Sequence, residues 1–289
     1  MNTLIAIVLL TFQANVPPIG MILQSEGEVF VQRGTARTPA KLADLLYPGD
    51  QVVTATGQAT FLFCPSAERA SIKNGARVEL GADAIVTRGG AAPTKVAARC
   101  TLPKVALGAE NLERIGGLRA RGDPPIIVFL GGAITTSRPT FEWVPAARAA
   151  SYQLTVRDAG GATVWQQRLA APASSLAYPQ ANSDLKAGAY QWELRAEADR
   201  TLVGEGVAAF EVKPSAELSR PPSDDAASRL IRVVELENAG YYAEAAAGYR
   251  AMFTAYPSDE RIARRLVLLY WNAGLFAGMK DVMDTNEIK

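Results

Sequence analysis

Three segments of this 289-residue chain each have their own spacing of apolar positions. In 27–80 and 139–212, apolar and polar residues alternate in short runs separated by Gly, Pro, Asn and Asp. Such period-two runs predict short antiparallel strands. From 226 onward the apolar residues recur at helical spacing, which predicts α-helices. The chain is therefore predicted to be mainly β with a C-terminal α segment.

The first segment combines its strand pattern with specific turns. Pro48-Gly49-Asp50 predicts a tight turn, Gly57 a second one, and Asn74-Gly75 a hairpin turn. The whole segment reads Gly27-x-Val-x-Val-x-Arg33, Leu46-x-x-Gly-Asp50, Thr54-x-x-Gly-x-Ala59 and Ile72-x-x-Gly-x-Arg-Val-Glu-Leu80. This pattern resembles the FecR domain. The resemblance implies a compact, mostly antiparallel β module on the outer side of a cytoplasmic membrane.

The middle segment has the strand spacing of a β-sandwich, and Asp158-Ala-Gly-Gly161 predicts its clearest hairpin. The run Leu185-Lys-Ala-Gly-Ala-Tyr-Gln-Trp192 resembles the tyrosine corner of a fibronectin type III or immunoglobulin-like domain. That resemblance implies that the Tyr190 hydroxyl bonds backward to the main chain. Trp143, Trp165 and Trp192 suggest a carbohydrate-stacking surface, although burial in the core is the more common role of such residues.

The C-terminal segment follows a Pro- and Ser-rich linker, 214–223, and contains an internal repeat. Helices are predicted over 226–238, 243–256 and 261–272. Asn238-Ala-Gly240 recurs as Asn272-Ala-Gly274 thirty-four residues later, which is the tetratricopeptide (TPR) period. The signature residues are Gly240, Ala245, Tyr249, Pro257 and Gly274. In the second copy Met279 replaces the small residue, so the motif gives weaker support to a fourth helix.

The tetratricopeptide resemblance implies a protein-binding groove, and a plain helical cap is the alternative. Two helix pairs are fewer than an independent solenoid usually needs. We therefore expect these helices to pack on the neighbouring sandwich, to pair with another chain, or to be only marginally stable.

The N-terminus and the two cysteines both point to export. The apolar run Leu4–Phe12 is too short to cross a bilayer and is typical of a signal peptide, with an uncleaved anchor or a buried first strand as alternatives. Cys64 and Cys100 are predicted to lie on inward faces of neighbouring strands and to form a disulfide, which would stabilise the fold by roughly 3–4 kcal/mol. The alternative is two buried free thiols.

Composition argues against several classes of function. Thirty basic and twenty-nine acidic residues give a net charge of +1, and no basic cluster suggests nucleic acid. The chain contains no histidine, which excludes Ser-His-Asp and Cys-His activation and imidazole metal sites. No cofactor or metal motif is present, so neither catalysis nor a cofactor is expected.

Together these features predict the following organisation: 1–20 signal peptide or N-terminal anchor, 21–121 FecR-like β domain, 122–213 immunoglobulin/fibronectin type III-like β-sandwich, 214–223 linker and 224–289 tetratricopeptide-like helices. The predicted function is binding or scaffolding of a protein partner in the periplasm or another extracytoplasmic part of a bacterial cell envelope. The alternative is binding of a glycan or peptidoglycan. No transmembrane helix beyond the leader is expected.

Overall fold

The computed structural model describes residues 16–104, 107, 126–213 and 225–286. It contains two compact units, Met1–Leu102 and Pro103–Lys289. Most of the predicted leader, the predicted boundary at 121/122 and the whole linker 214–223 lie outside the described residues. Within the described part of the chain, no helix is both long and apolar enough to cross a membrane. The structure confirms the predicted fold class, with β-sheets followed by a segment of four helices.

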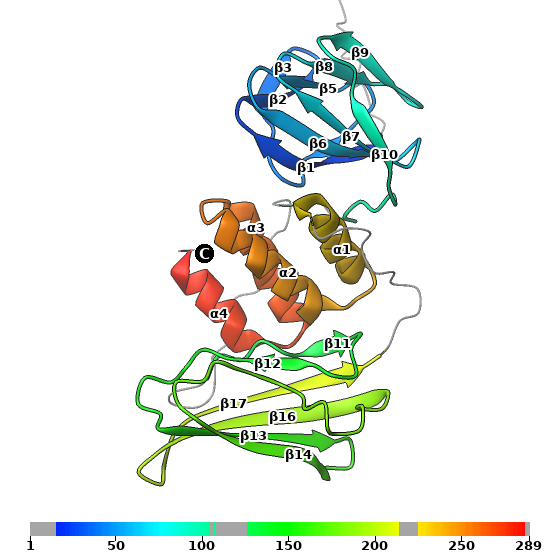
Figure 1. Cartoon of the computed structure of the whole chain (residues 1–289). Coiled ribbons are helices and arrows are strands. Elements are labelled where there is room, and N and C mark those ends of the chain that lie inside the picture. Colours follow the sequence, from blue (N-terminus) through cyan, green and yellow to red (C-terminus); the bar gives the residue numbers. More distant parts are fainter. Residues whose placement is uncertain (1–15, 105–106, 108–125, 214–224, 287–289) are drawn as a thin grey trace, which may run out of the picture. The chain divides into compact units, whose positions relative to one another are not determined.

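The first unit consists of two five-stranded antiparallel sheets (Figure 1). One sheet has the order β10-β7-β6-β1-β4 and the other β3-β2-β5-β8-β9. The strands are β1 Gly20–Glu26, β2 Val29–Arg33, β3 Ala36–Pro39, β4 Leu45–Leu46, β5 Gln51–Thr54, β6 Gln58–Phe63, β7 Glu68–Lys73, β8 Arg77–Leu80, β9 Ile85–Gly89 and β10 Thr94–Ala97. Alternate residues such as Val31, Val52, Phe61 and Val78 form one buried cluster between the sheets. This is the burial that the period-two pattern predicted.

The turns of the first unit were predicted with one error. The turn before Asp50 is present, with the Asp50 amide donating to the Tyr47 carbonyl at 3.1 Å. The predicted hairpin at Asn74-Gly75 is wrong, because β7 and β8 belong to different sheets. Gly75 has φ +73° and carries the chain across from one sheet to the other. Asn74 accepts a hydrogen bond from the Gly57 amide, which joins this crossing to the β5–β6 crossing.

The second unit contains a β-sandwich with a five-stranded sheet, order β11-β17-β16-β13-β14, and a two-stranded sheet, β12-β15. Its strands are β11 Gly132–Ile134, β12 Thr140–Glu142, β13 Ser151–Asp158, β14 Thr163–Ala170, β15 Ser175–Ala177, β16 Gly188–Ala198 and β17 Thr201–Val212. The Phe141 ring lies 5.0 Å from the Trp192 ring and 5.8 Å from the Trp165 ring, centroid to centroid. An aromatic cluster therefore fills the space between the sheets.

Both turn predictions for this sandwich are confirmed. The Asp158 side chain accepts from two amides of its own turn, at 2.9 and 3.0 Å, and closes the β13–β14 hairpin. The Tyr190 hydroxyl donates to the Lys186 carbonyl at 2.9 Å, as the tyrosine-corner resemblance implied.

The three tryptophans do not form a stacking surface. Trp143, Trp165 and Trp192 are 2%, 7% and 0% exposed. A sugar ring cannot reach side chains that are packed in the core. The carbohydrate-stacking hypothesis for these three residues is therefore wrong, because the apolar burial of each ring outweighs any use at the surface.

The C-terminal helices are α1 Ala226–Asn238, α2 Tyr242–Ala255, α3 Glu260–Asn272 and α4 Phe276–Thr285. The second pair starts thirty-four residues after the first, and the caps repeat with it. Asp225 accepts from an amide of α1, and Asp259 does the same for α3. Gly240 and Gly274, at φ +87° and +72°, end α1 and α3 in the same way. The fourth helix forms although Met279 replaces the small residue, since Met279 is itself buried.

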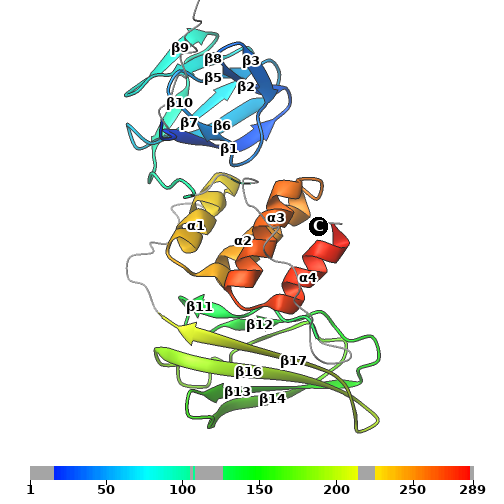
Figure 2. The same ribbon diagram turned by 180° about the vertical axis from the view of Figure 1, so that it is seen from behind.

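The four helices form a layer next to β11 and β12 (Figures 1 and 2). Glu244 of α2 accepts hydrogen bonds from the amide and hydroxyl of Thr135, and its burial raises the pKa of the carboxyl group. Arg250 forms an ion pair with Glu142 and lies over the Phe129 ring, 4.1 Å from its centroid. Of the two expected arrangements, the described residues show packing on the sandwich.

Candidate functional site

The candidate binding site is a hollow of about 300 Å³ in the first unit, beside the edge strands β3 and β4. Each of these strands is the last of its sheet, so the hollow lies where the sandwich is open at its side. It is lined by Val31, Arg33, Ala36, Thr38, Asp44 and Leu45. A concave site flanked by edge strands can take both side chains and main chain of a ligand.

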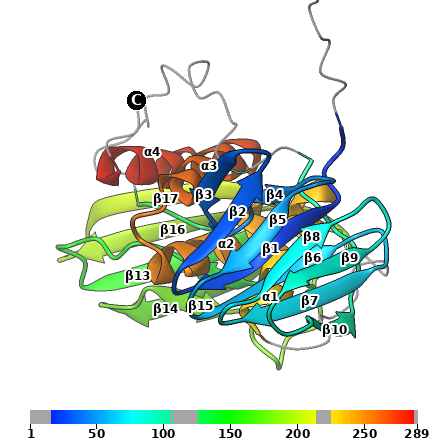
Figure 3. The same cartoon turned by 90° about the horizontal axis from the view of Figure 1, so that it is seen from above.

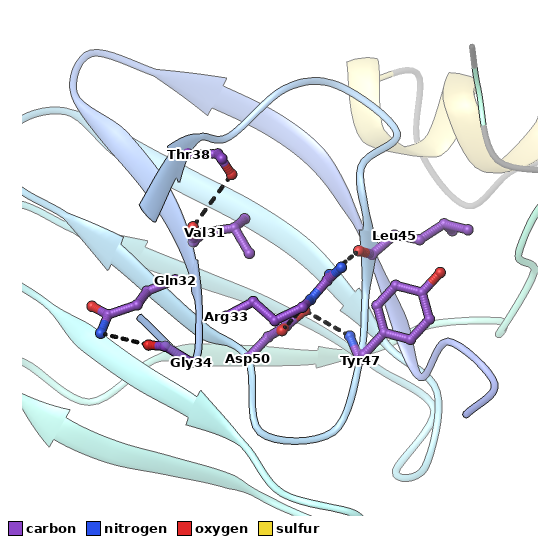
Figure 4. A network of polar contacts seen from close by, with 8 residues as sticks. All are labelled: Val31, Gln32, Arg33, Gly34, Thr38, Leu45, Tyr47 and Asp50. Atoms are coloured by element: carbon purple, nitrogen blue, oxygen red, sulfur yellow. Dashed lines mark hydrogen bonds and ion pairs between the residues drawn. The ribbon is translucent and has the colours of Figure 1, made fainter. Parts of the chain in front are cut away.

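Arg33 is one of the two charged residues that line this hollow, and Figure 4 shows its polar contacts. Its Nε and Nη2 atoms each donate to a different oxygen of Asp50 at 2.8 Å, and Nη2 also donates to the Leu45 carbonyl at 3.3 Å. The hydrogen bond to Asp50 raises the pKa of the Arg33 guanidinium. The Tyr47 ring supports it further, because the guanidinium carbon lies 4.4 Å from the ring centroid. The cation is therefore held in one orientation.

Asp50 is the buried partner, and its role is to hold this arrangement. The residue is 1% exposed, and it also accepts from the Tyr47 amide at 2.9 Å. Three donors, two from Arg33 and one from the Tyr47 amide, hold the carboxylate in place. The arrangement fixes the turn after β4 and positions Arg33, which remains 57% exposed, toward the hollow.

The walls of the hollow are chemically mixed. Val31, Ala36 and Leu45 supply apolar surface, while Thr38 donates to the Val31 carbonyl at 3.4 Å. On the other side, Asp44 accepts from the Lys41 amide at 2.7 Å. A hollow with one cation, one anion and apolar walls is better suited to a ligand with several kinds of side chain than to a simple anion.

The sequence contained Arg33 and Asp50 as parts of the FecR-like pattern, but not as a pair. One signal could have revealed the pair. Arg33 follows Val29 and Val31 at the alternate spacing that the pattern directs inward, and a charge at such a spacing suggests a partner, although Arg33 is itself exposed at the end of β2. The partner, Asp50, lies seventeen residues further along the chain, after the chain has changed from one sheet to the other. Local sequence patterns do not specify a contact of this kind.

The predicted disulfide is present, but its predicted surroundings are wrong. Cys64 and Cys100 are bonded, with their Cα atoms 5.0 Å apart. Cys64 lies in the turn after β6, and Cys100 is an exposed residue three positions beyond the end of β10. Val96, which has the same strand parity as Cys100 in the sequence, is 50% exposed. The bond therefore joins two loops at the surface, because β10 is an edge strand without a covered face.

The tetratricopeptide signature residues serve the packing of the helices. Ala245 and Tyr249 are buried in α2, at 0% and 2% exposure, and Pro257 follows the end of that helix. Gly240 and Gly274 occupy the turns after α1 and α3. The structure thus places these residues inside the helical layer and at its turns, where they contribute to folding rather than to an exposed surface.

Comparisons with known proteins give no family for this chain. No protein-family model matches it, and no curated protein is similar to it. Solved structures with similarity include CopC from Methylosinus trichosporium OB3b, at 17% identity and a TM-score of 0.25, covering 32% of this chain and 99% of that one. An FMN-binding β-glucuronidase from Facaelibacterium prausnitzii L2-6 matches at 11% identity and a TM-score of 0.23, over 68% of this chain and 40% of the enzyme. The FN1-FN3 domains of chicken CNTN1 match at 11% identity and a TM-score of 0.22, covering 67% and 56% of the two chains. At these TM-scores none of the similarities supports a functional argument.

Proposed function

We propose that this chain is an exported, non-catalytic protein of the bacterial cell envelope that binds an extended segment of a partner protein. The observation that carries the proposal is the hollow between edge strands β3 and β4. The binding mode would be addition of a strand to β3, with side chains of the partner entering the hollow.

The chemistry of β3 supports this mode. All four of its side chains are exposed, and it pairs with β2 along one side. Main-chain groups along an edge strand are a template for another strand. Pro39 has no amide hydrogen, so pairing would be limited to the part of β3 that precedes it. Val31 and Leu45 would receive an apolar side chain, while Arg33 and Asp44 would select charged neighbours.

The disulfide supports the extracytoplasmic location, because disulfides persist in oxidising compartments. The predicted signal peptide or anchor at 1–20 agrees with export. The bidentate pair between Arg33 and Asp50 gives a physical reason for the FecR-like pattern in this chain. We assign the first unit to a FecR-like domain on this basis.

Two further assignments belong to the proposal for the second unit. The bond from the Tyr190 hydroxyl to the Lys186 carbonyl favours an immunoglobulin or fibronectin type III-like sandwich. The thirty-four-residue repeat of caps and turns favours a tetratricopeptide-like origin of the helices. Because these helices pack on the sandwich, we propose that they act as a cap on this unit and that the partner binds at β3.

Site-specific photo-crosslinking in the living host tests the proposal. A p-benzoylphenylalanine residue at Ala36 is expected to form an adduct with one envelope protein. Thr38→Arg, which fills the hollow, should abolish this adduct. Thr87→Arg is the matched control, since Thr87 lies on β9, the opposite edge of the same sheet, and like Thr38 is exposed and pairs with a buried valine. No adduct, or an adduct that survives Thr38→Arg, would overturn the proposal.

A further inference from the structure

β10 is a weakly attached edge strand of the first unit. It is the last strand of its sheet, where it pairs along one side with β7 (Figure 3). All four of its side chains are exposed, including Val96 at 50%. Lys95 of this strand forms an ion pair with Glu68 at 3.0 Å, and both residues lie at the surface. Apolar burial therefore does little to hold this strand in place.

The disulfide is placed where it compensates for this weakness. Beyond the strand, the Ala98 amide donates to the Ala67 carbonyl at 2.8 Å, and Cys100 then bonds to Cys64. Cys64 and Ala67 both belong to the turn between β6 and β7. The covalent bond thus attaches the end of β10 to its neighbouring hairpin, two residues before the first unit ends at Leu102.

The same bond is accessible to other molecules. Cys100 is exposed and Cys64 is half-buried, so a small thiol reagent or the active site of a dithiol enzyme can approach. Exposed disulfides are in general more readily exchanged than buried structural ones. In contrast, the core that holds the two sheets together is made of fully buried side chains such as Phe61 and Val78.

We infer that Cys64–Cys100 is a redox-controlled clasp, a site for reversible reduction by a dithiol oxidoreductase of the Cys-x-x-Cys class. One thiolate of the reductant attacks one sulfur of the bond and forms a mixed disulfide, which releases the other cysteine as a thiolate. The second thiol of the reductant then attacks the mixed disulfide. Two electrons pass to the chain, both cysteines end as thiols after proton uptake, and the reductant leaves as a disulfide.

The consequence of reduction is local. β10 separates from β7, while the two-sheet core remains folded. The main-chain groups of β7 on that side then become available, and β7 changes from an inner strand to an edge strand that can pair with another segment. In the oxidised chain β10 covers this edge of β7, and in the reduced chain the edge is free to pair with another strand.

Hydrogen exchange of the full chain tests the inference, with mass spectrometry before and after treatment with tris(2-carboxyethyl)phosphine. Amides of 94–98 and those of β7 that face β10 should exchange faster by about tenfold or more after reduction. Amides of β6 and β16 serve as internal controls and should not change. The Cys64→Ser/Cys100→Ser double variant should show the fast pattern without reductant and should not respond to it. Thioredoxin with its reductase and NADPH should reproduce the effect of the phosphine.

Three results would overturn the inference. The first is a bond in the native chain that neither the phosphine nor thioredoxin reduces. The second is unchanged exchange in 94–98 after reduction. The third is faster exchange throughout the first unit, β6 included, which would show that the bond holds the whole fold and not β10 alone. If the double variant does not fold, the reduced wild-type chain still decides among these results.

Discussion

Removing one partner of the ion pair between Glu237 of α1 and Arg265 of α3 should strongly destabilise the helical layer. Its closest N···O distance is 2.9 Å, and the two side chains are 13% and 5% exposed. The Tyr249 hydroxyl lies 3.3 Å from the same carboxylate. Arg265→Met removes the cation and leaves Glu237 charged in a buried position. Loss of one partner of a buried pair costs about 3–5 kcal/mol of the free energy of unfolding.

A double substitution distinguishes the net contribution of the ion pair to stability from the cost of burying one charge without its partner. In the Glu237→Met/Arg265→Met double variant, two apolar side chains of similar length occupy the same space. Such replacements are often neutral or stabilising, so the double variant should lie within about 1 kcal/mol of the wild type or above it. The two single substitutions should therefore be strongly non-additive.

Urea denaturation followed by tryptophan fluorescence is the appropriate assay. All four tryptophans of the chain lie in the second unit, so the signal reports on that unit. With an m-value of about 2 kcal/mol/M, Arg265→Met should lower the midpoint by about 1.5–2.5 M. Arg264→Met is the matched control. Arg264 precedes Arg265 in the same helix, but it pairs with Glu260 at the surface, and its loss should cost less than about 0.5 kcal/mol.

Two results would refute this reasoning. If Arg265→Met costs no more than Arg264→Met, the pair is not buried in solution. If the double variant is as unstable as the single one, the loss comes from packing around the arginine stem and not from an isolated charge.

Three further predictions concern the same unit. Burial, followed by the nearby Glu237 charge, raises the pKa of the Tyr249 hydroxyl. The contribution of this group to the free energy of unfolding is therefore complete below the ordinary pKa of 10 and is lost as the pH rises above it. Tyr249→Phe should remove this part of the alkaline destabilisation in a pH series of urea midpoints. A Cβ on Gly131 would lie 2.7 Å from the Ala273 carbonyl oxygen, so Gly131→Ala should cost about 1–3 kcal/mol in the same assay, whereas Gly160→Ala in the exposed hairpin should cost less. Tyr190→Phe removes one hydrogen bond to the main chain and should cost about 1 kcal/mol.

Local sequence features predicted the parts of the fold that depend on neighbours in the chain. The Asp158 hairpin and the repeated Asn-Ala-Gly at Gly240 and Gly274 each depend on a few consecutive residues, and the structure has turns at these positions. The tyrosine corner also spans only four residues between Tyr190 and its acceptor. Such short-range geometry is specified by residue type and spacing alone.

The errors involve the choice of a partner at long range. Asn74-Gly75 has the composition of a hairpin turn, but whether two strands pair or separate into different sheets depends on the packing of the whole sandwich. Val96 belongs to an alternating pattern, yet it lies on an edge strand that no second layer covers. The hollow around Arg33 depends on contacts across seventeen residues and two sheets, so the sequence pattern could name its residues but not assemble them.

The oxidation state and location of the full chain in its host test the central claim most directly. Cells are fractionated into cytosolic and extracytoplasmic contents, and the chain from each fraction is alkylated without reductant and weighed intact. We expect the chain outside the cytosol and without added alkyl groups, since Cys64 and Cys100 are bonded. A chain confined to the cytosol that gains two alkyl groups would contradict export, and with it the proposed role in the cell envelope.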